Sequence, residues 1–184
     1  MLEKKFTYVV ILLMVFSQVS LAHVFADDGS TASDPASSST NYDLTYPGIL
    51  PDNPLYFLKM AKDNVLSFFI GKPLEKATFI LMQSDKQISA SKLLLNQNKD
   101  KSLIHETTVN SQNYFEAAID TTIDAKKQGY DIHEIIGILQ SASKKHHQII
   151  DEINSNLSVS DQKQFVDVSA KADDLMKTTA SLKP

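Results

Sequence analysis

The chain has 184 residues, a formal net charge of -4 and no cysteine, and its 18 basic residues are all lysines. Without cysteine, thiol nucleophiles, disulfides and zinc–thiolate sites are excluded. Without arginine, nucleic acid is not an expected partner, because bidentate contacts with phosphates and guanines depend on the arginine fork.

Residues 1–26 have the three parts of a secretory signal peptide. Two lysines precede an apolar run over residues 6–16, and small residues at Ala22 or Ala26 offer two cleavage frames. The alternative is an uncleaved anchor, because residues 6–26 are about as long as a membrane helix must be. Either way we expect an extracytoplasmic protein, secreted, periplasmic or on the cell surface. Membrane contact is expected only through an uncleaved anchor.

Residues 27–41 contain no apolar side chain larger than alanine and are rich in serine, threonine and aspartate. Such a segment buries too little surface to offset its ordering entropy, so it is predicted to be a disordered linker. The remaining residues have room for one domain with one core. We predict a helical domain over residues 42–178 and a frayed tail over residues 179–184.

The first predicted helix follows a rigid apolar arm over residues 46–59. Asn53 fits an N-cap, Pro54 the first helical position and Gly71 a stop. The residues at helical 3-4 spacing are Leu58, Ala61, Val65 and Phe68. Other faces of this helix are also apolar, so we expect the bundle to enclose it. The alternative is an exposed apolar patch for a partner or a membrane surface.

Two long helices are predicted next, over residues 73–96 and 102–127. The packing seam of the first consists of Leu74, Ala77, Leu81, Ser84, Ile88, Ser91 and Leu95. The seam of the second consists of Ile104, Thr108, Ser111, Phe115, Ala118, Thr122 and Ala125. Spacings of three and four residues are typical of coiled-coil-like packing. Small and hydroxyl side chains dominate the second seam, so it is expected to be the weakest core face.

The last two helices follow Gly129, which fits a helix stop. Asp131 and Glu134 form a capping box for a helix that ends near Asn154. Its seam consists of Ile132, Ile135, Leu139, Ala142, His146, Ile149 and Ile153. A fifth helix begins near Ser158 or Ser160, and its apolar residues are Phe165, Val168, Ala172 and Leu175. Long helices of similar length joined by short links predict an all-α, up-and-down helical bundle of four to five helices.

The search for chemical motifs is negative. Five glycines provide no dinucleotide-binding, phosphate-binding or nucleophile-elbow motif, and no metal-binding helix motif is present. We therefore expect neither an enzyme nor a cofactor.

Two adjacent histidines, His146 and His147, have both a structural and a functional interpretation. His146 lies on a packing seam, where a buried imidazole needs a hydrogen-bond partner, and the hydroxyls of the neighbouring seams are expected to supply it. The alternative role for His146 is a pH-responsive or metal-binding group. His147 and Asp151 have a spacing that can hold a metal, but two ligands are too few for a specific site. A solvated ion pair is the preferred interpretation.

The arm also carries a resemblance. Its run Leu50-Pro51-Asp52-Asn53-Pro54-Leu55-Tyr56-Phe57-Leu58-Lys59 resembles the opening signature of the prokaryotic domain-of-unknown-function family 5667, a helical extracytoplasmic domain. The later run beginning at His146 resembles a second motif of that family. Residues 83–90 lack the arginine and glutamate that the family pattern has there. The resemblance covers about residues 46–153 and implies a fold and a location, with no known activity.

The signature residues Pro51, Asn53, Pro54, Leu55, Tyr56 and Lys59 are accordingly expected to be structural, as is His146. Tyr46, Ile49, Leu50, Leu55 and Tyr56 are predicted to lie as an apolar clasp across the bundle.

Two functions are compatible with these observations. The first is a non-enzymatic protein-interaction or structural module of the cell envelope, with a protein partner and no nucleic acid. The second is a metal-binding or pH-responsive envelope protein that uses His146, His147 and Asp151.

Overall fold

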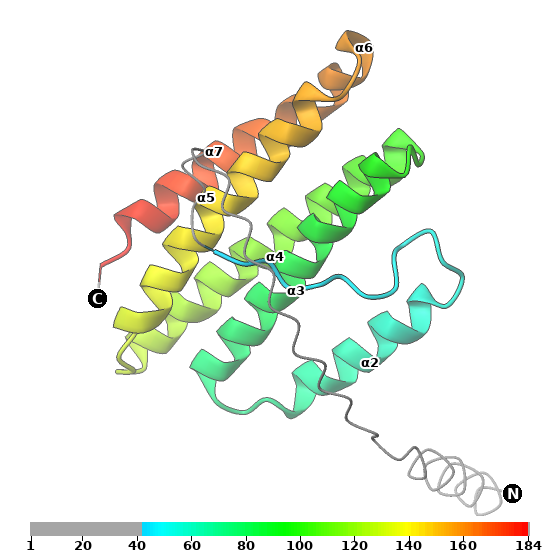
Figure 1. Cartoon of the computed structure of the whole chain (residues 1–184). Coiled ribbons are helices and arrows are strands. Elements are labelled where there is room, and N and C mark those ends of the chain that lie inside the picture. Colours follow the sequence, from blue (N-terminus) through cyan, green and yellow to red (C-terminus); the bar gives the residue numbers. More distant parts are fainter. Residues whose placement is uncertain (1–41, 184) are drawn as a thin grey trace, which may run out of the picture. The chain divides into compact units, whose positions relative to one another are not determined.

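The structure, a computed structural model, describes residues 42–183, so the predicted signal peptide or anchor and the linker lie outside it. Every regular element in the described range is helical (Figure 1). The elements are α2 (Tyr56–Phe69), α3 (Pro73–Asn96), α4 (Lys101–Lys127), α5 (His133–Ser155), α6 (Val159–Gln162), the 3-10 helix η2 (Lys163–Phe165) and α7 (Val166–Ser181). The predicted all-α bundle is confirmed. Among these helices, none combines the length and apolar character needed to cross a membrane.

Four long helices form the bundle as two antiparallel hairpins, α3 with α4 and α5 with α7 (Figure 1). In addition, α3 packs against α5 and α4 packs against α7, whereas the consecutive helices α4 and α5 touch only slightly. The link between α4 and α5 therefore crosses a diagonal of the bundle. As a result, α3 and α5 are neighbours that run in the same direction.

The predicted packing seams of the three longest helices are confirmed. Every seam residue on α4 and α5 is buried, and so is every seam residue on α3 except the half-buried Leu74. The hydroxyl-rich seam of α4 packs closely on α3. The Ser84 hydroxyl donates to the Ser111 carbonyl at 2.7 Å, and the Ser111 hydroxyl donates to the Ser84 carbonyl at 3.0 Å. Small side chains bring the two helices close enough to satisfy these buried polar groups.

The core consists of two apolar clusters separated by a polar layer. One cluster surrounds Phe115 and Leu139 near the α4–α5 link, and the other surrounds Ile153 and Phe165 near α6. The buried residues between them on α3, α4 and α5 are Ser84, Asp85, Gln87, Ser111, Gln112, Ser143 and His146. Buried polar groups in this position need hydrogen-bond partners, because an unpaired polar group in a core is costly.

Local sequence signals explain some of the ends of the later helices. Gly129 adopts a φ of +87° after α4, as expected for a helix stop. The predicted capping box of Asp131 and Glu134 does not form, because the N-cap of α5 is Ile132 without a side-chain cap, and Asp131 Oδ1 instead accepts from the His133 N–H at 3.0 Å in an Asx-type turn. Ser158 Oγ accepts from the Asp161 N–H at 3.3 Å at the start of α6. The helical region continues to Ser181, three residues beyond the predicted boundary at 178, and Thr179 is buried.

The start of the first helix differs from the prediction. Asn53 does not cap it, because α2 begins at Tyr56, and Asn53 Oδ1 instead accepts from the Leu55 N–H at 2.9 Å within a turn. Pro54 lies in the same turn, ahead of the helix. The short Asx-type turn competes successfully with capping because the asparagine side chain reaches its own backbone two residues on.

The orientation of α2 also corrects the prediction. The four residues that were expected to face the core are exposed, with Val65 57% and Phe68 85% accessible. The inward side instead carries the buried Asp63 and the half-buried Met60. The expectation that the bundle encloses this helix is therefore wrong.

The segment that precedes α2, residues 42–55 and called the arm from here on, crosses the bundle, but with different residues from those predicted. Leu50 and Tyr56 are half-buried as expected, whereas Tyr46, Ile49 and Leu55 are exposed. The additional apolar contacts come from Tyr42 on the first core cluster and from Leu44 on the second. The arm thus joins the two halves of the core.

Candidate functional site

The polar layer is centred on the carboxylate of Asp85, from the middle of α3. Tyr42, from the arm, donates its hydroxyl to Asp85 Oδ2 at 2.8 Å, and His146 Nε2, from α5, lies 2.7 Å from Asp85 Oδ1. Asp85 and His146 are only 3% and 5% exposed. The expected hydroxyl partners of His146 are replaced by a carboxylate, because α3 and α5 lie side by side.

This three-residue chain is electrostatically complementary. Burial, and after it the negative charge of Asp85, raises the pKa of Tyr42 far above its usual range, so the phenol stays protonated and donates. Each Asp85 oxygen has one partner, which offsets part of the cost of burying the carboxylate. The imidazole of His146 also packs against Phe115, with ring centroids 5.1 Å apart. The Tyr42–Asp85–His146 chain therefore connects the arm, α3 and α5 through satisfied polar contacts.

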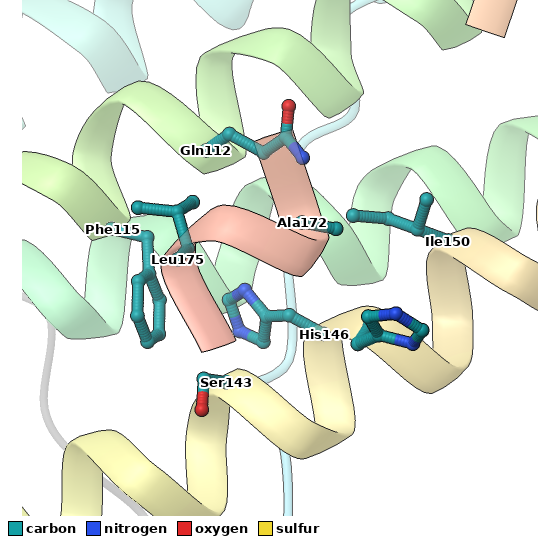
Figure 2. A pocket seen from close by; sticks show the side chains of 8 residues that line it. Gln112, Phe115, Ser143, His146, Ile150, Ala172 and Leu175 are labelled. Atoms are coloured by element: carbon teal, nitrogen blue, oxygen red, sulfur yellow. The ribbon is translucent and has the colours of Figure 1, made fainter. Parts of the chain in front are cut away.

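A small cavity adjoins His146, and Figure 2 shows its lining from three helices. Its volume is about 10 Å³, and its lining residues are Gln112, Phe115, Ser143, His146, His147, Ile150, Ala172 and Leu175. A space of this size holds roughly one water molecule. The Ser143 hydroxyl lies 2.9 Å from Thr179 Oγ1 and 3.0 Å from the Gln140 carbonyl oxygen. The arrangement couples helices and leaves no room for a substrate next to the imidazole.

His147 forms the predicted ion pair with Asp151, at 3.0 Å from Nδ1, and a second one with Asp173 of α7, at 2.7 Å from Nε2. The two carboxylates occupy opposite nitrogens of the ring. A single metal ion cannot bind both nitrogens, so this geometry is that of a bridging ion pair. Between residues 42 and 183, no three acidic or histidine side chains are grouped to hold a metal.

A third histidine makes a related contact. His105 Nε2 lies 3.4 Å from Asp167 Oδ1, and its ring packs edge-on against Phe165 with centroids 5.1 Å apart. His105, His146 and His147 thus each reach an aspartate on a different helix. The sequence predicted only the contact with Asp151, because only that pair lies within one helix turn. The only sequence signal for the role of Asp85 was its position next to Ser84, a residue of the α3 packing seam.

Two residues of the signature run attach the arm and α2 to the bundle. Tyr56 Oη accepts from Gln87 Nε2 of α3 at 2.6 Å. Lys59 donates to the Pro47 carbonyl at 2.8 Å, and its ammonium lies 5.2 Å from the centre of the Tyr56 ring. Burial lowers the pKa of Lys59 and raises that of Tyr56.

The turn that contains Pro51, Asn53 and Pro54 is tied to the bundle as well. Asp52 forms an ion pair with Lys99, just beyond α3, at 2.8 Å. Residues of the signature run therefore make the contacts that hold the arm on the bundle.

The most exposed apolar surface is the outer face of α2, which consists of Phe57, Leu58, Ala61, Val65, Phe68 and Phe69. At about 100° per residue these six side chains cover an arc of roughly 120°. Nine of the twelve exposed large apolar side chains in the described chain fall between residues 46 and 69. Apolar exposure is therefore concentrated on one segment rather than scattered, as single exposed residues on a monomer would be.

A family model described as Domain of unknown function (DUF5667) matches residues 48–160. The match begins in the arm and ends in α6, so it covers more than half of the chain, including Asp85, His146 and all of α2. It confirms the resemblance seen in the signature run. Comparisons with curated proteins and with solved structures find no match.

Proposed function

Because the chain belongs to the DUF5667 family, whose description names no activity, we propose a function from the surface of α2. The protein is a non-enzymatic module that binds another protein outside the cytoplasm. The observation that carries this proposal is the outward direction of the apolar face of α2.

A surface helix normally turns its apolar side to the core and its polar side to water. In α2 the buried side chain is Asp63, and Phe57, Phe68 and Phe69 are 64%, 85% and 76% exposed. These three rings alone present roughly 350–550 Å² of apolar surface. The largest patch on a typical monomer is about 300–600 Å², and patches of that size often mark binding sites.

The orientation of the polar side favours a protein over a lipid surface. A helix that lies in a membrane interface directs its lysines toward the headgroups. In α2, Lys59 donates to the Pro47 carbonyl of the arm, and Lys62 lies 3.4 Å from Asp63. In contrast, the 3-4-3 spacing of Leu58, Ala61, Val65 and Phe68 is that of a helix-packing seam. A helical protein surface matches this pattern.

The other parts of the proposal have separate support. The extracytoplasmic location rests on the signal-like pattern of residues 1–26. The non-enzymatic part of the proposal rests on the lack of a catalytic motif in the sequence.

Site-specific photo-crosslinking in cells tests the proposal. A photoreactive phenylalanine analogue replaces Phe68 in the full chain, and the matched control carries it at Val166, which is also exposed but lies on α7. We expect a protein adduct from position 68 and none from position 166. Equal adducts from both positions, or lipid adducts alone, would exclude the outer face of α2 as a protein-binding surface.

A second candidate function is a response to pH, which the buried contact between His146 and Asp85 favours. The titratable group that faces this imidazole is Asp85 from α3, whose other oxygen accepts from Tyr42, while α4 contributes Phe115 and Gln112 and α7 contributes Ala172 and Leu175. A change in charge at this contact alters the attachment of the arm. The free energy of unfolding of wild type and His146→Gln, measured between about pH 5 and 8, tests this function. A constant difference between the two proteins would rule it out.

A further inference from the structure

We infer that the partner of the outer face of α2 is a second copy of the chain, with the two α2 helices packed antiparallel across a two-fold axis. This inference rests on the proposed function, because it names the partner of the same surface. Three observations support it, namely the residue spacing, the available area and the dipoles of the two helices.

The spacing makes the face self-complementary. When two copies of Leu58, Ala61, Val65 and Phe68 run in opposite directions, Leu58 lies opposite Phe68 of the second copy. Ala61 then lies opposite Val65 of the second copy. Large side chains at the ends and a small side chain near the middle let the backbones approach closely, as in other helix pairs. Two-fold pairing of one patch with itself is the most common arrangement in homo-oligomers.

The area suits a dimer of modest affinity. Helix α2 has 14 residues and is about 21 Å long. Three exposed phenylalanines from each copy, with Leu58 and Val65, approach the roughly 1,200 Å² at the lower limit of specific interfaces. We therefore expect association that depends on concentration, with a dissociation constant near the micromolar range.

The helix dipoles favour the antiparallel direction. In an antiparallel pair the positive N-terminal end of each α2 lies beside the negative C-terminal end of the other. Lys62 lies beside the outer face and is 3.4 Å from Asp63 of its own chain, so it does not decide the direction. Asp63 does not enter the contact, because it is buried against the rest of the bundle.

Disulfide trapping tests the arrangement cleanly, because the chain has no cysteine of its own. Leu58→Cys and Phe68→Cys are introduced separately into the full chain, and the two proteins are mixed under mild oxidation. Positions 58 and 68 are about 15 Å apart along one helix, whereas a disulfide needs Cα atoms within about 7 Å. We expect the mixed 58–68 dimer to dominate. Preferential 58–58 and 68–68 dimers would overturn the antiparallel arrangement.

Sedimentation over a range of concentrations tests whether two copies of the chain associate. We expect twice the mass of one chain at high concentration. Phe68→Ser/Phe69→Ser should weaken the dimer at least tenfold, and the control Val166→Ser should leave it unchanged. A monomer at every concentration would overturn the inference. In that case a protein adduct from position 68 would leave the proposed function standing, whereas its absence would remove both.

Discussion

Asp85 shows how a single buried charge organises this fold. Its carboxylate holds the arm through Tyr42 and holds α5 through His146, with both distances below 3 Å. Buried contacts of a carboxylate add little to stability compared with well-packed apolar residues, but removal of one partner is costly. The consequence is a fixed register between α3, α5 and the arm.

The first prediction concerns this carboxylate. Asp85→Ala should lower the free energy of unfolding by about 3 kcal/mol, because Tyr42 and His146 lose their buried partner. Urea denaturation measures the change. The control is Asp173→Ala, which removes a half-exposed partner of His147 and should cost about 1 kcal/mol or less. Equal losses in the two variants would contradict the central position of Asp85.

The second prediction concerns Tyr42, whose pKa is raised from an ordinary value of 10.0 by burial and by Asp85. The unfolded chain loses this phenolic proton above about pH 10 and the folded chain keeps it, so the stabilisation is complete below pH 10 and declines above it. Tyr42→Phe should therefore be less stable than wild type at neutral pH. The difference should shrink by up to about 1.4 kcal/mol per pH unit above pH 10.

Chemical denaturation at several alkaline pH values checks this expectation. Tyr46→Phe is the matched control, because Tyr46 lies on the same arm and is 77% exposed. A difference between wild type and Tyr42→Phe that stays constant from neutral to alkaline pH would disprove the role given to this phenol.

Among the elements, α2 shows the limit of what periodicity can establish. The 3-4 pattern identified the apolar face of α2 as well as it identified those of α3, α4 and α5. A periodic pattern does not specify whether a face meets the core or the solvent. The direction in which this face points is set by hydrogen bonds on the opposite side of α2. These bonds join Tyr56 to Gln87 and Lys59 to Pro47, which are not neighbours in the sequence.

The third prediction concerns two glycines, Gly129 just after α4 and Gly137 within α5. Gly129 has a φ of +87° after α4, and a Cβ there meets no atom within 4 Å, so Gly129→Ala should cost about 1 kcal/mol from backbone strain alone. Gly137 lies within α5 with similar open space, so Gly137→Ala should stabilise by about 0.5–1 kcal/mol. Thermal unfolding of both variants measures the changes. If both substitutions raised or both lowered the unfolding temperature, then either α4 would not end at Gly129 or Gly137 would not lie within α5.

At the scale of the whole molecule, the polar layer divides one bundle into two apolar halves. The seams of α3, α4 and α5 were predictable, because their spacing is local and their lengths match. The contacts within the layer were not predictable. Asp85 and His146 meet only because the α4–α5 link crosses the diagonal and makes α3 and α5 neighbours, and no local pattern encodes that order. The arm is similar, since Tyr42 lies 43 residues from its partner.

The proposed function and the antiparallel dimer both require that the outer face of α2 is a binding surface and not a part of the core. The most direct test is the free energy of unfolding of Phe68→Ser/Phe69→Ser, measured by urea denaturation on dilute protein. We predict a value within about 0.5 kcal/mol of wild type, because exposed side chains away from special features change stability little. A loss of about 3 kcal/mol or more, the cost of truncating a buried phenylalanine, would show that this face is part of the core and contradict the binding surface.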